Sequence, residues 1–386
     1  YMPPLAEVPA RMIRENPETV YDYTAKGNLV AIVTDGSAVL GLGNIGPRAA
    51  MPVMEGKAIL FQTFAGVEAF PICLCTQEAD KIVEIVKSMS PTFGGINLED
   101  ISAPRCFYIE RRLREEMDIP VFHDDQHGTA IVVTAAFLNS LKISGKRAED
   151  VRVVINGAGA AAIAVCKLIM EIGIKQIILC DTKGAIYAGR ADGMNWIKEE
   201  IAQQTNLERI TGDLANAVKG CDVFIGLSVA GALSKAMIST MAEAPVIFAL
   251  ANPTPEILPD AAKEAGALIV ATGRSDFPNQ VNNSLVFPGV FRGALDVRAR
   301  MINEEMKIAA ARTIAELVSD KELSPEYIIP RGMDFKVPPA VAAAVARAAM
   351  KTGVARIEVD PESIAQRTRT LIYEGEPGYH KEDGIP

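Results

Sequence analysis

The chain has 386 residues, 49% of them hydrophobic and 23% charged, and its formal net charge is −9. This length favours about two domains with sizeable cores. The acidic balance argues against nucleic acid as the main partner, because phosphate binding needs clustered Lys and Arg. No apolar run reaches membrane-spanning length and no secretory signal pattern is found, so we expect no membrane partner.

Six cysteines are scattered along the chain, at positions 73, 75, 106, 166, 180 and 221. The pair at 73 and 75 lacks a second pair at zinc-ribbon spacing. We therefore expect core thiols in a cytoplasmic protein, where cysteines stay reduced. The chain begins with Tyr1 instead of methionine, which indicates a piece of a longer translation product.

The first glycine motif is VLGLGNIG at residues 39–46, with the spacing of a dinucleotide-binding loop. It follows two β-rich runs around Asp35-Gly36, and Asp-Gly between such runs favours a hairpin. Pro47 and Pro52 follow, which predicts that no long helix begins there. Because a dinucleotide loop needs a strand before it and a helix after it, we expect these glycines to serve a turn.

Lys57 lies in the apolar stretch PVMEGKAILF, residues 52–61. A lysine surrounded by apolar residues can have a lowered pKa and act as a general base. The alternative is a surface lysine whose ammonium group reaches solvent, and position alone does not separate the two.

Two acidic clusters follow short apolar runs: Glu99-Asp100 after PTFGGI, and Asp124-Asp125 after IPVF. Adjacent carboxylates repel each other unless they are neutralised. A hard divalent cation such as Mg²⁺ or Mn²⁺ does this with oxygen ligands.

Zinc is the alternative metal, bound by His123 and His127, which are four residues apart and would share a helix face. No third nitrogen or sulfur ligand is evident. We therefore favour the acidic ligands and expect His127 to cap or pack near the start of a helix at 128–142.

The second glycine motif has the context that the first lacks. Residues 151–156 read as an apolar strand, residues 160–172 as an apolar helix, and QIILCD places Asp181 at the end of the next strand. This strand–loop–helix pattern, with an acid after the second strand, predicts a dinucleotide site. The candidate cofactor residues in its loop are Gly157, Ala158, Gly159, Ala160 and Ala161.

Three further apolar runs, at 222–228, 245–252 and 267–273, alternate with helical patterns. Such alternation predicts a parallel sheet whose ligands gather at the carboxyl ends of the strands. Ser228, Asn252 and Arg274 are then candidates for the edge of the site. The alternative, with equal weight on this evidence, is that each is an ordinary polar loop residue.

The C-terminal part is predicted to contain two helices. Residues 293–318 read as one long amphipathic helix that returns the chain to the first domain. Residues 338–353 read as another, with Pro at its start and Gly at its end. The tail from residue 354 is polar, and we expect it to be mobile.

Taken together, these segments resemble the malic enzyme family, and most closely its shorter bacterial form. The resemblance runs in order from residue 1 to roughly residue 350. It implies oxidative decarboxylation of L-malate to pyruvate and CO₂ with NAD(P)⁺ and a divalent metal. The motifs that carry it are EGKAILF, PTFGGINLEDI, IPVFHDDQHGTA, NGAGAAAIA, FALANPTPEI and TGRSDFPNQVNNSLVFPG.

The resemblance also implies roles for the catalytic residues. Lys57 matches the general base that takes the hydroxyl proton, and Asp124 matches its neighbour. Mg²⁺ or Mn²⁺ would be held by Glu99, Asp100 and Asp125.

Other roles follow in the same way. Asn252 and Asn283 match the asparagines that hold the substrate carboxylate and the cofactor amide. Tyr1 matches the tyrosine that protonates the enolpyruvate carbon, although Met2 and Pro4 depart from the Ser or Thr and the Gly of the family segment.

Cofactor choice depends on Asp181, which favours NAD because its carboxylate would repel a 2′-phosphate. Lys183 could offset that charge, so NADP stays possible. Two alternatives to a malic enzyme remain: a zinc-dependent hydrolase or lyase, and a non-catalytic dinucleotide-binding regulator.

The predicted fold is α/β with two domains. Residues 1–128 form a metal- and lysine-bearing domain, 129–284 a Rossmann-type nucleotide domain with a doubly wound parallel sheet, and 285–386 helices that return to the first domain. The resemblance further implies a homodimer or a higher homo-oligomer.

Overall fold

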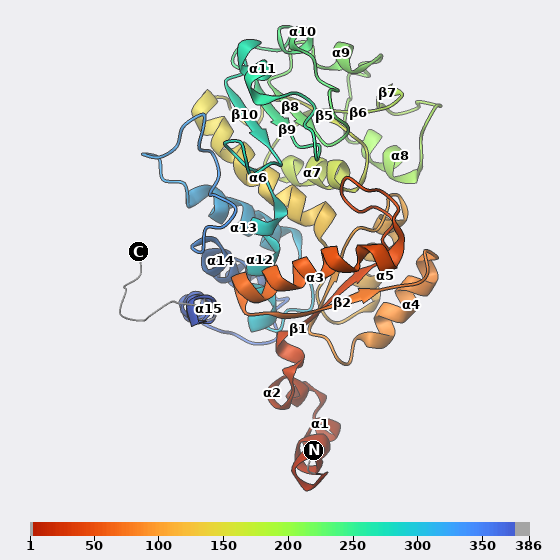
Figure 1. Cartoon of the computed structure of the whole chain (residues 1–386), viewed down its shortest axis with the longest axis vertical. Coiled ribbons are helices and arrows are strands. Elements are labelled where there is room, and N and C mark those ends of the chain that lie inside the picture. The colour runs from red at the N-terminus through yellow and green to blue at the C-terminus, as the bar shows by residue number, and fades with distance from the viewer. Residues whose placement is uncertain (1–2, 375–386) are drawn as a thin grey trace.

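Two parallel β-sheets organise the chain in the computed structural model, which describes residues 3–374 (Figure 1). The smaller sheet has four strands in the order β2-β1-β3-β4. Its central strands are almost entirely apolar and are shielded from solvent, as expected for a parallel sheet covered on both faces. The strands are β1 (Leu29–Thr34), β2 (Glu68–Cys73), β3 (Gly95–Leu98) and β4 (Val121–His123).

The larger sheet has six strands in the order β10-β9-β8-β5-β6-β7, and only β7 runs antiparallel. Strands β5, β6 and β7 lie on one side of the β5/β8 boundary and β8, β9 and β10 on the other, which is a doubly wound arrangement. The strands are β5 (Arg152–Asn156), β6 (Gln176–Asp181), β7 (Gly184–Ala185), β8 (Val223–Gly226), β9 (Val246–Ala249) and β10 (Ile269–Thr272).

Helices cover both sheets. No helix within residues 3–374 is both long enough and apolar enough to cross a bilayer. Those before the larger sheet are α1 (Pro3–Glu15), α2 (Val20–Tyr23), α3 (Gly46–Ala65), α4 (Ala79–Met89), α5 (Arg105–Glu116) and α6 (Asp124–Ser144), with 3₁₀ turns η1 (Pro17–Thr19) and η2 (Ala25–Asn28). Those within it are α7 (Ala160–Glu171), α8 (Trp196–Ala202), α9 (Leu214–Ala217), α10 (Lys235–Ile238) and α11 (Pro259–Glu264).

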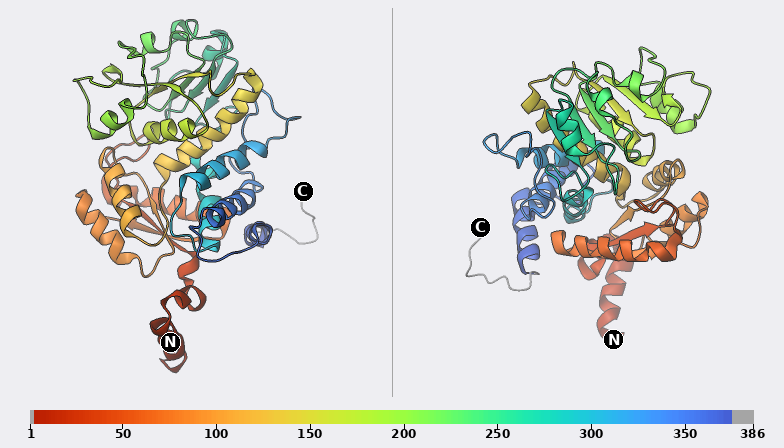
Figure 2. Two further views of the ribbon diagram at one scale, coloured as in Figure 1. Left: turned by 180° about the vertical axis from the view of Figure 1, so that it is seen from behind. Right: turned by 45° about the horizontal axis from the view of Figure 1, so that its top comes forward.

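The C-terminal helices return to the smaller sheet. They are α12 (Phe287–Asp296), α13 (Glu304–Glu316), α14 (Val337–Lys351) and α15 (Pro361–Glu374), preceded by the 3₁₀ turn η3 (Asn283–Leu285). Helix α12 packs against α3, and α14 packs against α12 and α13. Both views of Figure 2 show these helices gathered beside the smaller sheet, while α1 projects away from it. The exact domain boundaries at 128 and 284 stay a prediction.

Helix α6 joins the two halves. It begins directly at the end of β4 in the smaller sheet and packs along α7 of the larger one and along α13 (Figure 1). Its buried side chains belong to one continuous hydrophobic cluster that also contains residues of both sheets. The two sheets are therefore held in one orientation by a shared core rather than by a linker.

Two predictions for residues 35–52, the hairpin and the absence of a long helix, are wrong. Strand β1 leads into a loop, Val39 and Gly43 form only an isolated bridge, and no hairpin is present. The loop is followed by α3, a helix of 20 residues. Pro47 lies in its first turn, where the missing N–H has no intrahelical partner to lose. Pro52 lies inside the helix, where burial of the inward face outweighs the loss of one hydrogen bond.

The long helix predicted at 293–318 is also wrong, because two helices occupy it. Helix α12 ends at Asp296, and Arg298 adopts a left-handed φ of 50° that a helix cannot continue through. Helix α13 then starts afresh behind Asn303, whose side chain accepts the Met306 N–H at 3.0 Å. In the predicted mobile tail, residues 361–374 form α15, and residues 375–386 lie outside the described part.

A buried ion pair within α12 allows a test of how the C-terminal helices pack. Arg292 is 1% exposed and pairs with Asp296 at 2.6 Å. We expect Asp296→Ala to lower the free energy of unfolding by about 3–5 kcal/mol, because the Arg292 charge would stay buried without its partner. Arg367 pairs with the same carboxylate but its side chain is 62% exposed. Arg367→Ala should therefore cost less than about 1 kcal/mol. Urea unfolding of both variants measures this, and equal losses would contradict it.

Candidate active site

The two predicted acidic clusters meet at one edge of the smaller sheet. Strands β3 and β4 are parallel neighbours, so the residues that follow their carboxyl ends lie side by side. Ligand oxygens of Glu99, Asp100 and Asp125 all lie within 4.8 Å of one another. The Asp100 N–H donates to Asp125 Oδ2 at 2.8 Å, and Asp100 has a left-handed φ of 54°. Such backbone strain in a non-glycine residue is typical of functional sites.

These carboxylates repel each other in a poorly solvated place. Burial, reinforced by the neighbouring negative charges, raises the pKa of Glu99 to about 7, of Asp100 to about 9 and of Asp125 to about 6. A divalent cation with oxygen preference would relieve this repulsion. Within residues 3–374 the trio is the set of His, Cys, Asp and Glu side chains grouped closely enough to hold a metal. The donor set therefore fits Mg²⁺ or Mn²⁺.

Lys57 reaches this trio from α3. The inward face of the helix carries Ala50, Met54 and Phe61, and Lys57 falls on the same face by the 3.6-residue repeat. It is 7% exposed, so the surface-lysine alternative is wrong. Its Nζ lies 2.7 Å from Glu99 Oε2 and also pairs with Asp124.

The electrostatics of Lys57 differ from the expectation of a lowered pKa. Burial alone would lower the pKa of Lys57, but the carboxylates of Asp124 and Glu99 outweigh it and hold the pKa above its ordinary value. The ring of Phe287 beneath the ammonium group, 4.1 Å from Nζ to the centroid, adds a further attraction. With both carboxylates ionised, the lysine is therefore a charged partner.

Asp124 links Lys57 to Asn283. It is fully buried, and its Oδ2 accepts the Asn283 Nδ2–H at 2.7 Å. A Cβ on Gly128 would lie 1.9 Å from Asp124 Oδ1 and 3.1 Å from the Asn283 Cβ. Only glycine fits at position 128, because a side chain there would meet the Asp124 carboxylate one turn earlier in α6.

The zinc alternative is wrong. His127 Nε2 lies 2.6 Å from Glu110 Oε1 and its Nδ1 lies 3.0 Å from Lys307 Nζ, so neither ring nitrogen is free for a metal. His123 belongs to β4 and not to a helix face shared with His127, since α6 begins at Asp124 rather than at 128.

The second glycine motif forms the predicted strand–loop–helix unit between β5 and α7. Gly157 has a φ of 135°, and a Cβ there would lie 2.5 Å from the Leu227 carbonyl oxygen. The N-terminus of α7 follows at Ala160, where free backbone N–H groups suit a pyrophosphate. Gly157 and Ala158 shape the turn, while Gly159, Ala160 and Ala161 face a cavity of about 410 Å³.

This cavity brings the two halves of the site together. Asn252, Asn283 and Asp125 line it together with the second glycine loop. The second glycine loop and a carboxylate of the acidic trio thus line one space, at the carboxyl ends of both sheets.

The first glycine motif also lines this cavity. Its neighbour Ala38 and its own Leu40 line the same cavity. Gly41, Gly43 and Gly46 all have positive φ, between 72° and 78°, which confirms a tightly turned loop. The turn and the second glycine loop therefore share one cavity, and the expectation that the turn binds no cofactor phosphate stays a prediction.

Asp181 ends β6 and is surrounded by cations. Arg190 Nη1 lies 2.8 Å from its Oδ1, and Lys198 Nζ lies 2.7 Å from its Oδ2. Against the effect of burial, these hydrogen bonds lower the pKa of Asp181 to about 2. Lys183, the expected offsetting cation, donates only its backbone N–H to Asp181, and its side chain pairs with Asp192 at 3.5 Å. No local pattern could have identified Arg190 and Lys198.

The remaining candidates lie elsewhere. Ser228 bonds to Asn156 and to the buried Glu256, and Arg274 pairs with Asp276. Neither lines the cavity, so of the three strand-end candidates only Asn252 does. Tyr1 lies outside the described residues, and its role stays a prediction.

Comparison with known proteins decides the family. A family model described as malic enzyme, N-terminal domain, matches residues 6–114, and one described as malic enzyme, NAD binding domain, matches residues 126–350. The chain belongs to the malic enzyme family. It carries the NAD-binding domain of that family, which confirms the resemblance and the α/β fold with its Rossmann-type domain.

Individual malic enzymes are similar over nearly the whole chain. A bifunctional malic/malolactic enzyme of Bacillus subtilis is 63% identical over 97% of this chain and 92% of its own length. An NAD-dependent malic enzyme of Geobacillus stearothermophilus is 56% identical over 92% of this chain and 74% of its own length. The crystal structure of malic enzyme from Pyrococcus horikoshii superposes with a TM-score of 0.92 at 51% identity, covering 97% of this chain and 88% of that one. Relatives at about half identity carry both NADP- and NAD-dependent names.

Metal binding should depend on pH in a defined direction. Because the pKa values of these carboxyls are raised, the folded protein holds protons that the unfolded chain releases. The contribution of these carboxyls to the free energy of unfolding therefore falls as pH rises from about 4 toward about 9. Mn²⁺ would replace these protons. We expect saturating Mn²⁺ to raise Tm more at about pH 8.5 than at about pH 5.5, as measured by differential scanning fluorimetry.

Asp100→Asn is the matched control for this experiment. Asparagine tolerates the left-handed backbone of position 100, but its amide has no carboxyl proton to release. Most of the difference between the two pH values should disappear in this variant. An Mn²⁺ effect that is the same at both pH values in the wild type would contradict the assignment of the trio.

Proposed function

We propose that this chain catalyses the oxidative decarboxylation of L-malate to pyruvate and CO₂, with a nicotinamide dinucleotide and Mg²⁺ or Mn²⁺ as cofactors. The observation that carries the proposal is the cavity of about 410 Å³, in which Asp125 and Asn283 face the second glycine loop. Substrate held at the carboxylate trio would lie next to a nucleotide held at the N-terminus of α7.

Each cofactor has a chemical role at this site. When bound, the dinucleotide accepts the C2 hydride of malate, and the divalent cation stabilises negative charge on the C2 oxygen while C4 leaves as CO₂. Glu99, Asp100 and Asp125 would hold the cation through carboxylate oxygens.

Lys57 would move the proton of the reaction. Its Nζ is the basic nitrogen beside the carboxylate trio, and it accepts the proton of the C2 hydroxyl. Asp124, hydrogen-bonded to the same nitrogen, receives the proton that Nζ carries beforehand. Asn283 fixes the Asp124 carboxylate for this exchange. Tyr1 remains the proposed acid that protonates C3 at the end.

We further propose NAD as the preferred dinucleotide. The Asp181 carboxylate stands where it would meet the adenosine ribose and would repel a 2′-phosphate. Arg190 and Lys198 reduce that repulsion, since both donate hydrogen bonds to the carboxylate oxygens. A higher kcat/KM with NAD⁺ than with NADP⁺ is therefore expected.

The activity is tested by nicotinamide reduction with L-malate and Mn²⁺, comparing NAD⁺ with NADP⁺, and by measuring pyruvate and lactate. Lactate is included because the B. subtilis relative is named as malolactic as well. Lys57→Arg keeps the charge and the ion pairs but cannot lose its proton, so kcat should fall by about 10²-fold or more. Exposed Lys81→Arg is the control and should behave as wild type.

Three outcomes contradict the proposal. Full activity in Lys57→Arg would remove the lysine from the chemistry. A higher kcat/KM with NADP⁺ would overturn the cofactor preference. Dinucleotide binding without turnover of malate, in a folded protein with Mn²⁺, would favour the non-catalytic regulator.

We also propose that the chain assembles as a homodimer or larger homo-oligomer. Helix α1 stands away from the sheets in Figure 2 and exposes apolar side chains, with Leu5 at 70% and Val8 at 61%. A second copy would cover this face. Sedimentation velocity should show at least a dimer, and Val8→Glu should shift it toward monomer. A monomeric wild type would contradict the proposal.

A further inference from the structure

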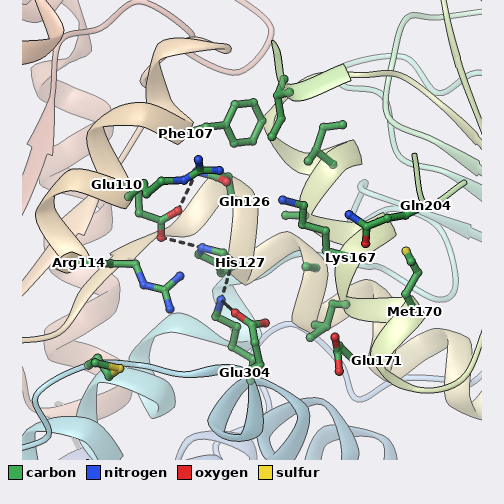
Figure 3. Close-up of a pocket in the computed structure, with 18 of the residues that line it drawn as sticks. Phe107, Glu110, Arg114, Gln126, His127, Lys167, Met170, Glu171, Gln204 and Glu304 are labelled. Atoms are coloured by element: carbon green, nitrogen blue, oxygen red, sulfur yellow. Dashed lines mark hydrogen bonds and ion pairs between the residues drawn. The ribbon is translucent and has the colours of Figure 1, made fainter. Parts of the chain in front are cut away.

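A second cavity lies behind the catalytic segment. It has a volume of about 600 Å³ and is enclosed by α5, α6, α7 and α13 (Figure 3). Helix α6 separates it from the nucleotide cavity, since Asp125 and Thr129 face one space while Gln126 and His127 face the other. No step of the proposed reaction uses this second space.

One wall of the cavity is a chain of buried charged groups. Glu110 Oε1 accepts from His127, and His127 in turn contacts Lys307 Nζ, which pairs with Glu304 at 2.8 Å. Lys307 is 1% exposed. Its ammonium group has three donors, of which two are used here, so one remains for a ligand.

Arg114 stands beside this chain with its donors unused. Within residues 3–374 its guanidinium has no hydrogen-bond or ion-pair partner. Figure 3 shows the side chain extending from α5 toward His127 and into the cavity. By contrast, the neighbouring Arg111 and the facing Lys167 are both paired with Glu200.

The facing wall combines apolar and polar side chains. Ile163, Leu168 and Ile197 are apolar, and Lys167, Glu171 and Gln204 are polar. A ligand that fits this space therefore has one anionic head for Arg114 and Lys307 and a short hydrocarbon body. Glu110 cannot bind a cation instead, because its oxygens already accept from Gln126, His127 and the His123 backbone N–H.

We propose that this cavity is a binding site for a small organic anion, with Arg114 as its anchoring cation. The site touches the catalytic segment through Glu110. That carboxylate holds the His123 N–H and Gln126, the residues on either side of Asp124 and Asp125. An anion that attracts the Lys307 ammonium group would alter its contact with His127, and through His127 the contact with Glu110.

The test is a series of ligand-observed NMR titrations of the full chain, with butyrate as the probe. Inorganic phosphate serves as an anion without a hydrocarbon chain, and butylammonium as a cation with the same hydrocarbon chain. Butyrate should bind, and saturating L-malate should not displace it. Arg114→Gln should weaken butyrate binding about tenfold or more, the size of a lost charge-assisted hydrogen bond. Arg114→Lys should keep part of the affinity, and Arg111→Gln should leave it unchanged.

Four results would overturn the proposal: equal butyrate binding in Arg114→Gln, displacement of butyrate by L-malate, equal binding of butylammonium, or phosphate binding tighter than butyrate. Because the readout is binding, the experiment does not depend on the proposed reaction. Unchanged thermal midpoints of the Arg114 variants, expected for a side chain without partners, show that folding is intact.

Discussion

The crowding of four carboxylates around one lysine is the constraint on which the site depends. Glu99, Asp100, Asp124 and Asp125 follow two neighbouring parallel strands. The first three are buried, and the Asp125 side chain is 30% exposed. Lys57 neutralises part of this charge, and the raised pKa values show that the rest is not compensated by the protein. Ion pairing alone would be poor stabilisation for such an arrangement, and we propose that a divalent cation supplies the missing positive charge.

Helix α6 connects the carboxylate cluster of the smaller sheet to the larger sheet. Its first residues supply Asp124 and Asp125, and its length packs on α7, whose N-terminus faces the nucleotide cavity. The absence of a side chain at Gly128 lets Asn283 reach Asp124. One helix therefore sets the distance between the carboxylate trio and the second glycine loop. The same helix forms the wall of the cavity that contains Arg114.

Much of this could be predicted from local sequence signals. Strand–loop–helix units such as residues 151–172, and acids directly after apolar strands, depend on neighbours in the chain. The failures depend on contacts from distant segments. Burial of its inward face keeps α3 helical through Pro52, Asn283 reaches Asp124 from η3, and Arg190 and Lys198 reach Asp181 by folding back. Lys57 was predicted as a base, but its charge state depends on carboxylates from two other elements.

The most direct test of this account is an anomalous difference map from crystals soaked with Mn²⁺ and measured near the manganese absorption edge. We predict one strong peak within coordination distance of Glu99, Asp100 and Asp125, with Lys57 beside it. A peak at His123 or His127, or no peak between the three carboxylates in a crystal where their side chains are ordered, would contradict the account.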